Sequence, residues 1–386
     1  MLLPDTAERD AGGRLRVGGC DIAALAGIHG TPLYIFDEAT LRSRLRAYRE
    51  ALRSWPAGGD VLYSAKAYLS PALVRLLVDE DCGIEVVSGG ELEIALRSGM
   101  SPARIGFAGN NKDAAEVGAA AAAGIGHLVV DSLHELGLAE TLPADRPLRA
   151  LLRLSPGIKP DTHDFISTGQ LDSKFGFSIE TGAALTALGQ SLRTSRLHVR
   201  GVHIHIGSQI FDLRSYAAAL EKVAWFLATA QQELGFVAAM LSIGGGLGIA
   251  YTERDNPPTV RKFMTILADS VRAVWESRAL TVPALVVEPG RSVVGPAGLA
   301  VYTVGARKEI LGVRTYVAID GGMADNLRPR LYGAVYQALA VIEPAGAGSE
   351  VVALAGRYCE STDILVEAAR LPRLEPGDLV ALPAAG

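Results

Sequence analysis

Cysteine and lysine are scarce in this sequence. Its 386 residues contain three cysteines and seven lysines, beside thirty arginines. The three cysteines, Cys20, Cys82 and Cys359, cannot all pair with one another, and their wide separation does not match the spacing of metal ligands. A disulfide-stapled fold is therefore excluded, and a reducing, cytoplasmic setting is expected.

Tracts of positive charge and long apolar spans are also missing. The net charge is −5 with acids and bases interspersed, which argues against nucleic acid or an anionic membrane as the main partner. The most apolar stretch, 114–130, contains a glutamate, a histidine and three glycines, so we interpret it as a helix leading into a strand. Residues 1–10 lack the basic start and apolar core of a secretory signal.

Eight short apolar runs recur along the middle of the chain, separated by segments whose apolar residues follow helical spacing. The runs are VLYSAK (61–66), GIEVVSGG (83–90), RIGFAGNN (104–111), HLVVDS (127–132), ALLRLSPG (150–157), VHIHIGS (202–208), MLSIGGG (240–246) and ALVVEPGR (284–291). Eight strand–helix units predict an α/β fold, a (β/α)8 TIM-like barrel. A doubly wound open sheet is the alternative, because periodicity alone does not distinguish a closed sheet from an open one.

Polar residues or glycines lie toward the end of each of these runs, where the strands of a barrel end. They are Lys66, Ser88, Asn110, Asp131, Arg153, His205, the glycines 244–246, and Glu288 with Arg291. The active site of such a barrel lies at the carboxyl ends of its strands. We therefore expect these side chains to surround one site.

Both ends of the chain indicate a second domain with little helix. The strand-like runs are 299–310, 315–322, 350–358 and 377–384, and the opening runs 14–19 and 31–36 could add strands to them. We predict a barrel domain over 36–292, and a mostly antiparallel β domain built from 1–35 and 293–386.

Two of the strand ends suit a phosphate-bearing cofactor. Gly244, Gly245 and Gly246 would let backbone N–H groups approach an anion, although such runs also serve tight turns. The sequence EPGR comes next in strand order, at the usual phosphate corner of a barrel. Glu288 in this motif would either pair with an arginine such as Arg291 or bond a protonated ring nitrogen of a cofactor.

Histidine and lysine complete the candidate site. His203 and His205 lie two residues apart and share one face of a strand. Either could be a buried core side chain, or its imidazole could press against a flat ring; no third residue with good spacing suggests a metal. Lys66, one of the few lysines, could be an ordinary surface residue, or it could form an imine with an aldehyde cofactor.

Together these motifs resemble the fold-type III pyridoxal-phosphate decarboxylases, most closely the diaminopimelate decarboxylases, whose fold is alanine racemase-like. The resemblance covers nearly the whole chain in one order. It rests on GTPLYIFDEATLRSR, YSAKAY, VVSGGELEIAL, GNNK, THDFISTGQLDSKFGF, HIHIGSQI, SIGGGLG, EPGRSVVG, DGGMADNLRPRLYGA and CESTDIL. It implies decarboxylation of meso-2,6-diaminopimelate to L-lysine, the last step of lysine biosynthesis, with pyridoxal 5′-phosphate as cofactor.

The resemblance also implies roles for cofactor-binding residues. Lys66 would attach the cofactor, His205 would stack on its ring, and Glu288 would pair with the pyridine nitrogen. Its phosphate would be held by Ser208, Gly244, Gly245, Gly246, Gly290 and Arg291.

The resemblance also implies which residues bind and protonate the substrate. Arg328 and Tyr332, with Arg291, would bind the substrate carboxylate. Cys359 would reprotonate the α-carbon, and Glu360 would bind the distal amino group. Family members are typically homodimers in which the CES segment reaches the partner's active site.

The chain departs from the family pattern in three places. Glu85 stands where the family usually has aspartate, and Tyr68 stands where many relatives have asparagine. The sequence ends at LPAAG, without the family's Gly-Ala-Tyr segment, so we expect a β domain truncated at its C-terminus. Two alternatives remain, a sister decarboxylase of ornithine, lysine or arginine, and a catalytically silent regulatory paralogue.

Overall fold

The structure is a computed structural model that describes residues 2–142, 147–158, 173–343, 346 and 348–386. The chain divides into two compact units. The barrel unit consists of Arg44–Gly248 and Pro258–Gly290; the β unit consists of Met1–Ser43, Ile249–Pro257 and Arg291–Gly386. The predicted boundaries at 36 and 292 remain a prediction.

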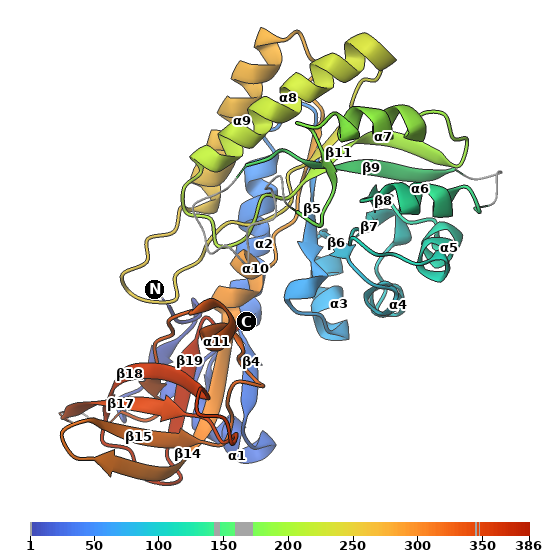
Figure 1. Cartoon of the computed structure of the whole chain (residues 1–386). Helices are drawn as coiled ribbons and strands as arrows, with labels where there is room; N and C mark the ends of the chain where they lie inside the picture. The colour runs from blue at the N-terminus through green and yellow to red at the C-terminus, as the bar shows by residue number, and fades with distance from the viewer. Residues whose placement is uncertain (1, 143–146, 159–172, 344–345, 347) are drawn as a thin grey trace. The chain divides into compact units, whose positions relative to one another are not determined.

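The barrel unit contains a closed ring of eight parallel strands (Figure 1). In ring order they are β5 (Gly59–Ser64), β6 (Gly83–Val86), β7 (Ile105–Phe107), β8 (His127–Val130), β9 (Leu148–Ser155), β11 (Leu197–Ile204), β12 (Met240–Ser242) and β13 (Ala284–Val287). Pairing of β8 with β9, and of β13 with β5, closes the ring. The predicted barrel is confirmed and the open-sheet alternative is wrong. A short strand, β10 (Phe177–Ser178), pairs with β9 outside the ring.

Several barrel helices begin at a residue whose side chain caps the first turn. Ser88 accepts a hydrogen bond from the backbone of Glu91 at the start of α4, and Ser132 does the same for Glu135 at the start of α6. Ser88, expected at the site, thus caps a helix. The helices are α2 (Glu38–Leu52), α3 (Pro71–Asp79), α4 (Gly89–Arg97), α5 (Ala114–Ala123), α6 (Leu133–Ala139), α7 (Ala183–Ser191), α8 (Arg214–Leu234) and α9 (Val260–Ser277).

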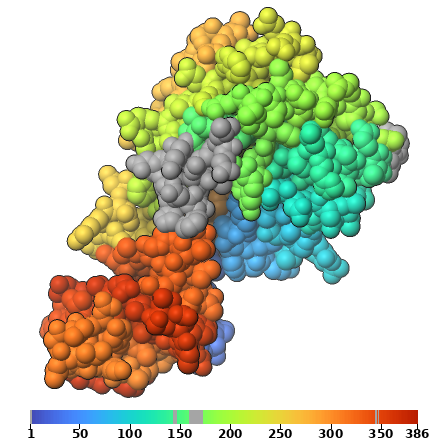
Figure 2. Space-filling view, viewed as in Figure 1, coloured from blue at the N-terminus to red at the C-terminus, as the bar shows by residue number. Residues whose placement is uncertain are grey.

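The long helices α8 and α9 lie side by side (Figure 1 and Figure 2). Strands β6 and β8 are buried at every residue. This explains why they read as continuous apolar runs instead of alternating ones. Within the described residues, no helix is both long and apolar enough to cross a membrane.

The β unit is built around a seven-stranded sheet in which only β15 and β17 pair in parallel. Its strands are β4 (Leu33–Phe36), β14 (Gly298–Ile310), β15 (Arg314–Ile319), β16 (Leu339–Ala340), β17 (Ser349–Ala355), β18 (Ile364–Pro372) and β19 (Leu379–Pro383). The mostly antiparallel domain is confirmed, and the run at 31–36 joins it through β14.

Three details of the β unit were not predicted. The run at 14–19 contributes instead to a separate small sheet of β1 (Glu8–Arg9), β2 (Leu15–Val17) and β3 (Cys20–Asp21). Strand β18 had no counterpart among the predicted runs. Short helices also occur: α1 (Ile22–His29), α10 (Arg291–Val294) and α11 (Arg328–Tyr332).

Candidate active site

A cavity of about 440 Å³ opens at the carboxyl ends of the barrel strands. Four residues for which the resemblance implies a cofactor role line it together: Lys66, His205, Ser208 and Glu288. Its remaining lining residues are Glu85, Val87, Ala108, Gly109, Asn110, Asn111, Arg153, Phe175 and His203. The strand ends therefore converge as the barrel prediction required.

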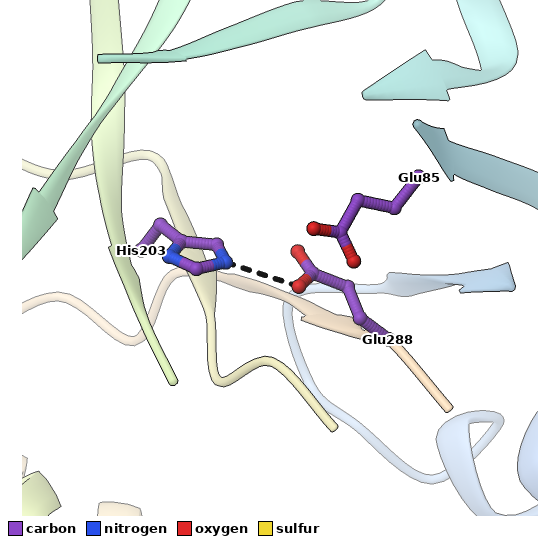
Figure 3. Close-up of side chains that lie close together, drawn as sticks. All are labelled: Glu85, His203 and Glu288. Atoms are coloured by element: carbon purple, nitrogen blue, oxygen red, sulfur yellow. Dashed lines mark hydrogen bonds and ion pairs between the residues drawn. The ribbon is translucent and has the colours of Figure 1, made fainter. Parts of the chain in front are cut away.

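Glu288 follows β13 and is nearly fully buried, yet both carboxylate oxygens have partners. Ser242 Oγ donates to Oε1 at 2.5 Å, and His203 Nε2 lies 3.0 Å from Oε2 (Figure 3). Burial raises the pKa of Glu288, while the hydrogen bond from Ser242 and the charge of Lys66 oppose that rise. A cation in the cavity would therefore stabilise the charged form of Glu288. The predicted alternative of an ion pair with Arg291 has no support among the contacts of Glu288 in the described structure.

Glu85, from β6, lies close to Glu288 and His203 (Figure 3). One ligand atom from each of the three residues lies within 4.8 Å of the others. Ser64 Oγ donates to Glu85 Oε2 at 2.9 Å. Burial, and after it the charge of Glu288, raises the pKa of Glu85. Two buried carboxyl groups this close cannot both ionise cheaply, so Glu85 is the better candidate to hold a proton.

His203 is neutral in this structure. Burial, and after it the charge of Arg153, lowers its pKa to about 3. A neutral imidazole can donate from Nε2 to Glu288, so the pair is a hydrogen bond and adds no positive charge to the site. Its Nδ1 is buried and has no hydrogen-bond partner in the described part of the chain.

The glycine run packs against the segment that carries His205. A Cβ on Gly244 would lie 2.6 Å from His205 Nδ1, and one on Gly246 would lie 2.4 Å from the carbonyl oxygen of Gly207. A Cβ on Gly245 would lie 2.2 Å from the carbonyl oxygen of Glu288. All three positions therefore require glycine, and Gly244 and Gly246 also have positive φ angles.

His205 itself is held by this run. The backbone N–H of Gly245 points at His205 Nδ1 across 3.4 Å. Burial, with the charges of Lys66 and Arg153, lowers the pKa of His205 well below its usual value. The ring is therefore neutral, which suits a flat surface for stacking.

Lys66 lies in a short 3-10 turn, Ala65–Ala67, directly after β5. Its side chain is exposed to the cavity, and it makes no hydrogen bond or ion pair with any residue that the structure describes. Gly290 packs behind this turn, since a Cβ there would lie 3.0 Å from the Ala67 Cβ. The turn thus presents Lys66 as an unpaired amine.

Two buried ion pairs support the cavity wall. Arg153 Nη1 lies 3.0 Å from Asp131 Oδ1, and its guanidinium lies 4.2 Å from the centre of the Phe175 ring. Lys112 Nζ lies 3.0 Å from Glu135 Oε2 and also donates to two backbone carbonyls. The sequence placed Arg153 and Asp131 at strand ends without a role; their pairing shows that they brace adjacent strands β9 and β8.

The β unit holds the predicted carboxylate-binding residues in one cluster around Tyr251. Arg291 Nη1 donates to the Tyr251 hydroxyl at 2.5 Å. The Arg328 guanidinium lies 5.0 Å from the Tyr251 ring centre and 5.3 Å from that of Tyr332. Tyr336 packs edge-on against Tyr251. Sequence reasoning missed Tyr251, because it lies in an irregular segment between barrel elements.

Cys359 and Glu360 lie on an exposed loop between β17 and β18. The buried carboxylate of Asp363 organises this loop, accepting from the backbone of Met323 at 2.6 Å and of Tyr358 at 2.9 Å. The predicted motif THDFISTGQLDSKFGF falls mostly on 162–172, which lie outside the described residues.

Comparisons with known proteins agree with this geometry. Residues 38–295 match the family described as pyridoxal-dependent decarboxylase, pyridoxal binding domain. The chain is 41% identical to a diaminopimelate decarboxylase of Bacillus subtilis, over 99% of this chain and 88% of that protein.

Two solved structures show the same fold. A diaminopimelate decarboxylase from M. jannaschii, in complex with L-lysine, superposes with a TM-score of 0.92 at 35% identity, covering 100% of this chain and 89% of that one. A lysine/ornithine decarboxylase from Vibrio vulnificus, complexed with putrescine, gives a TM-score of 0.78 at 25% identity, covering 95% and 91%.

Proposed function

This chain belongs to the pyridoxal-dependent decarboxylase family, and from that membership we propose that it holds pyridoxal 5′-phosphate in the cavity at the carboxyl ends of its barrel strands. Its reaction is the decarboxylation of meso-2,6-diaminopimelate to L-lysine and CO₂, the last step of lysine biosynthesis. The observation that carries the cofactor assignment is the shared lining of one cavity by Lys66, His205, Ser208 and Glu288.

The residues present fit this cofactor. Gly244 and Gly245 pack against His205 and Glu288, which line the cavity, so the glycine cradle Gly244–Gly246 lies beside it and would offer backbone N–H groups to a phosphate. The unpaired amine of Lys66 suits covalent attachment of an aldehyde. Glu288 is a buried carboxylate whose raised pKa disfavours a lone charge, so it matches a protonated ring nitrogen that supplies the missing positive charge.

When bound, pyridoxal phosphate supplies an electron sink for the electron pair that departing CO₂ leaves behind. The chain's residues set the conditions for this chemistry. Glu288 would accept a hydrogen bond from the ring nitrogen, while Ser242 and His203 orient its carboxylate. His205 would cover one face of the ring, and Ser208 with Gly244–Gly246 would bind the phosphate.

Substrate recognition is assigned to the β unit. Arg328 and Tyr332, with Arg291, would bind the carboxylate that is retained, since guanidinium groups bind carboxylates with two parallel hydrogen bonds. Cys359 would deliver the proton to the α-carbon, and Glu360 would bind the distal amino group. The exposure of Cys359 and Glu360 supports a role toward a partner subunit, so we include a homodimer with shared active sites in the proposal.

We assign the barrel domain to 36–292 and the β domain to 1–35 and 293–386. All three cysteines are free thiols, which supports the reducing cytoplasm as the compartment.

The test is CO₂ release from meso-diaminopimelate with added pyridoxal phosphate, comparing the wild type with Lys66→Ala. Lys262→Ala, at an exposed position on α9, is the matched control. We expect release by the wild type and the control, and loss in Lys66→Ala together with loss of a borohydride-reducible chromophore. Release from ornithine alone would assign the chain to the sister decarboxylases, and a wild type without a chromophore would favour the silent paralogue.

The shared active site is tested by mixing two inactive variants. Lys66→Ala and Cys359→Ala subunits, unfolded and refolded together, should recover part of the activity, because a mixed dimer contains one intact site. A mixture that stays inactive, while each variant alone forms dimers, would contradict the sharing of sites.

A further inference from the structure

A second cavity, of about 380 Å³, lies at the other end of the barrel, where the strands begin. Several lining residues are the first or second of their strands, such as Asp60 in β5, His127 in β8 and Met240 in β12. Its full lining is Asp60, Leu62, Ala103, Arg104, Ile105, Gly126, His127, Arg149, His198, Arg200, Met240 and Val286. None of these residues lines the active-site cavity.

The lining has an excess of positive charge. It contains three arginines against one carboxylate, and that carboxylate is already paired, with Asp60 Oδ1 2.7 Å from Arg104 Nη2. Arg149 and Arg200 are exposed, and neither makes an ion pair or a side-chain hydrogen bond with any residue that the structure describes. Two guanidinium groups at this mouth are thus available to an anion.

A buried imidazole in the same cavity also lacks a partner. His127 is only 6% exposed, and its Nε2 has no hydrogen-bond partner among the described residues. Burial lowers the pKa of His127 to about 4, so the ring is neutral at physiological pH. A buried polar atom without a partner costs free energy, and a ligand oxygen in the cavity would remove that cost.

The backbone of β11 is shaped so that this strand serves both cavities. His198 lines the second cavity and His203 lines the active site, although residues five apart on a regular strand face opposite sides. A β-bulge between Val199 and Gly201 resolves this, because it inserts Arg200 as an extra residue in the pairing with β9. The bulge therefore turns both His198 and Arg200 toward the second cavity.

We propose that this cavity is a binding site for a small organic anion bearing carboxylate or phosphate groups. Arg149 and Arg200 bind its charged groups at the mouth, since the planar guanidinium matches both oxyanions. His127 bonds an oxygen deeper in the cavity, and Leu62, Ile105 and Met240 contact its carbon skeleton. The volume lies within the range of small-molecule sites, roughly 300–1,000 Å³.

The experiment is calorimetric titration of the full chain loaded with pyridoxal phosphate, so that the cofactor's own phosphate fills the glycine cradle. Inorganic phosphate and succinate are titrated separately, with sodium chloride holding the ionic strength constant. We expect saturable binding of at least one of them; phosphate alone would identify a phosphate ligand, and succinate alone a dicarboxylate.

Variants locate the binding. Arg149→Ala with Arg200→Ala should weaken the affinity by roughly tenfold or more for each charge-assisted hydrogen bond lost. Both side chains are exposed, so the double variant should fold, which circular dichroism checks. Arg75→Ala, at an exposed position on α3, should bind as the wild type does. No saturable binding by the wild type, or equal affinity in the double variant, would overturn the proposal.

Discussion

Nε2 of His203 lies 3.0 Å from Oε2 of Glu288, and each of these side chains is 2% exposed. Because burial keeps His203 neutral, this contact orients the Glu288 carboxylate without neutralising it. An arginine or a charged histidine at the position of His203 would instead have neutralised the charge of Glu288. The arrangement leaves the negative charge of Glu288 for a cation in the cavity.

Replacing Glu288 with glutamine should therefore lower kcat strongly while preserving the fold. Glutamine keeps the shape but cannot carry the charge that holds a protonated ring nitrogen, and loss of one such electrostatic contact typically costs about 10²–10³ in rate. Steady-state CO₂ release measures the effect. Ser242→Ala removes one hydrogen bond to Glu288 and keeps its charge, so this variant should lower kcat less. A Glu288→Gln enzyme with at least half of the wild-type kcat would refute the assigned role.

Glu85 should make the folded state less stable as pH rises. Its pKa is raised in the folded protein, so the folded state binds more protons than the unfolded state, and the stabilisation that this provides is lost as pH rises through the folded pKa. The charged or titratable groups that act on it are Lys66, Glu91, His127, His203 and Glu288.

The test compares wild type with Glu85→Gln, which mimics the protonated carboxyl. In urea denaturation, Glu85→Gln should be more stable than wild type at pH 8, and the two should converge at pH 4, where Glu85 is protonated in both states. Glu221→Gln, at an exposed position on α8, should show no such convergence. A wild type and a Glu85→Gln variant with parallel pH profiles would mean that Glu85 is ionised in the folded protein.

Gly245→Ala should damage both stability and cofactor retention. The added Cβ would meet the backbone carbonyl of Glu288 at 2.2 Å, and overpacking of this kind costs about 1–3 kcal/mol. Gly118→Ala is the control, since nothing lies within 4 Å of a Cβ there and alanine favours the helix α5. Thermal unfolding and cofactor absorbance after gel filtration report the two effects. If Gly245→Ala retains the cofactor as well as the wild type does, the glycine cradle does not bind the phosphate.

Asp363→Ala should loosen the loop that carries Cys359. The Asp363 carboxylate holds the backbone N–H groups of Met323 and Tyr358, so its loss frees the segment next to Cys359. In a Cys20→Ser background, where Cys359 is the one exposed thiol, its alkylation by iodoacetamide should accelerate. In Asp363→Asn, which retains one acceptor oxygen, the alkylation rate should lie between those of the wild type and Asp363→Ala. If the alkylation rate is unchanged in Asp363→Ala, other contacts hold the loop.

Local pattern was a good guide to the elements of the fold. Each of the eight predicted runs overlaps a barrel strand, because strands buried on both faces are mostly apolar. The polar residue after each run was also informative: Lys66, His205 and Glu288 line one cavity as expected. Strand β18 was missed, since its nine residues, ILVEAARLP, mix helix-forming and apolar residues.

Contacts between distant strands could not be predicted in the same way. Glu85 stood out only as a glutamate in place of aspartate, and nothing in its neighbourhood along the chain indicates Glu288 or His203 as a neighbour. The bulge at Arg200 was likewise invisible, although it decides which histidines of β11 share a face.

Residue order and residue type were thus sufficient to predict the barrel strands, the β domain and several residues that line the cavity at the strand ends. These features depend on periodicity and on the chemistry of single side chains. Three features could be seen only in the tertiary structure: the closure of the ring, the shared burial of Glu85 and Glu288, and the second cavity with its arginines. The physical reason is that burial and proximity depend on the register of strands far apart in sequence, and these two quantities set every shifted pKa at the site.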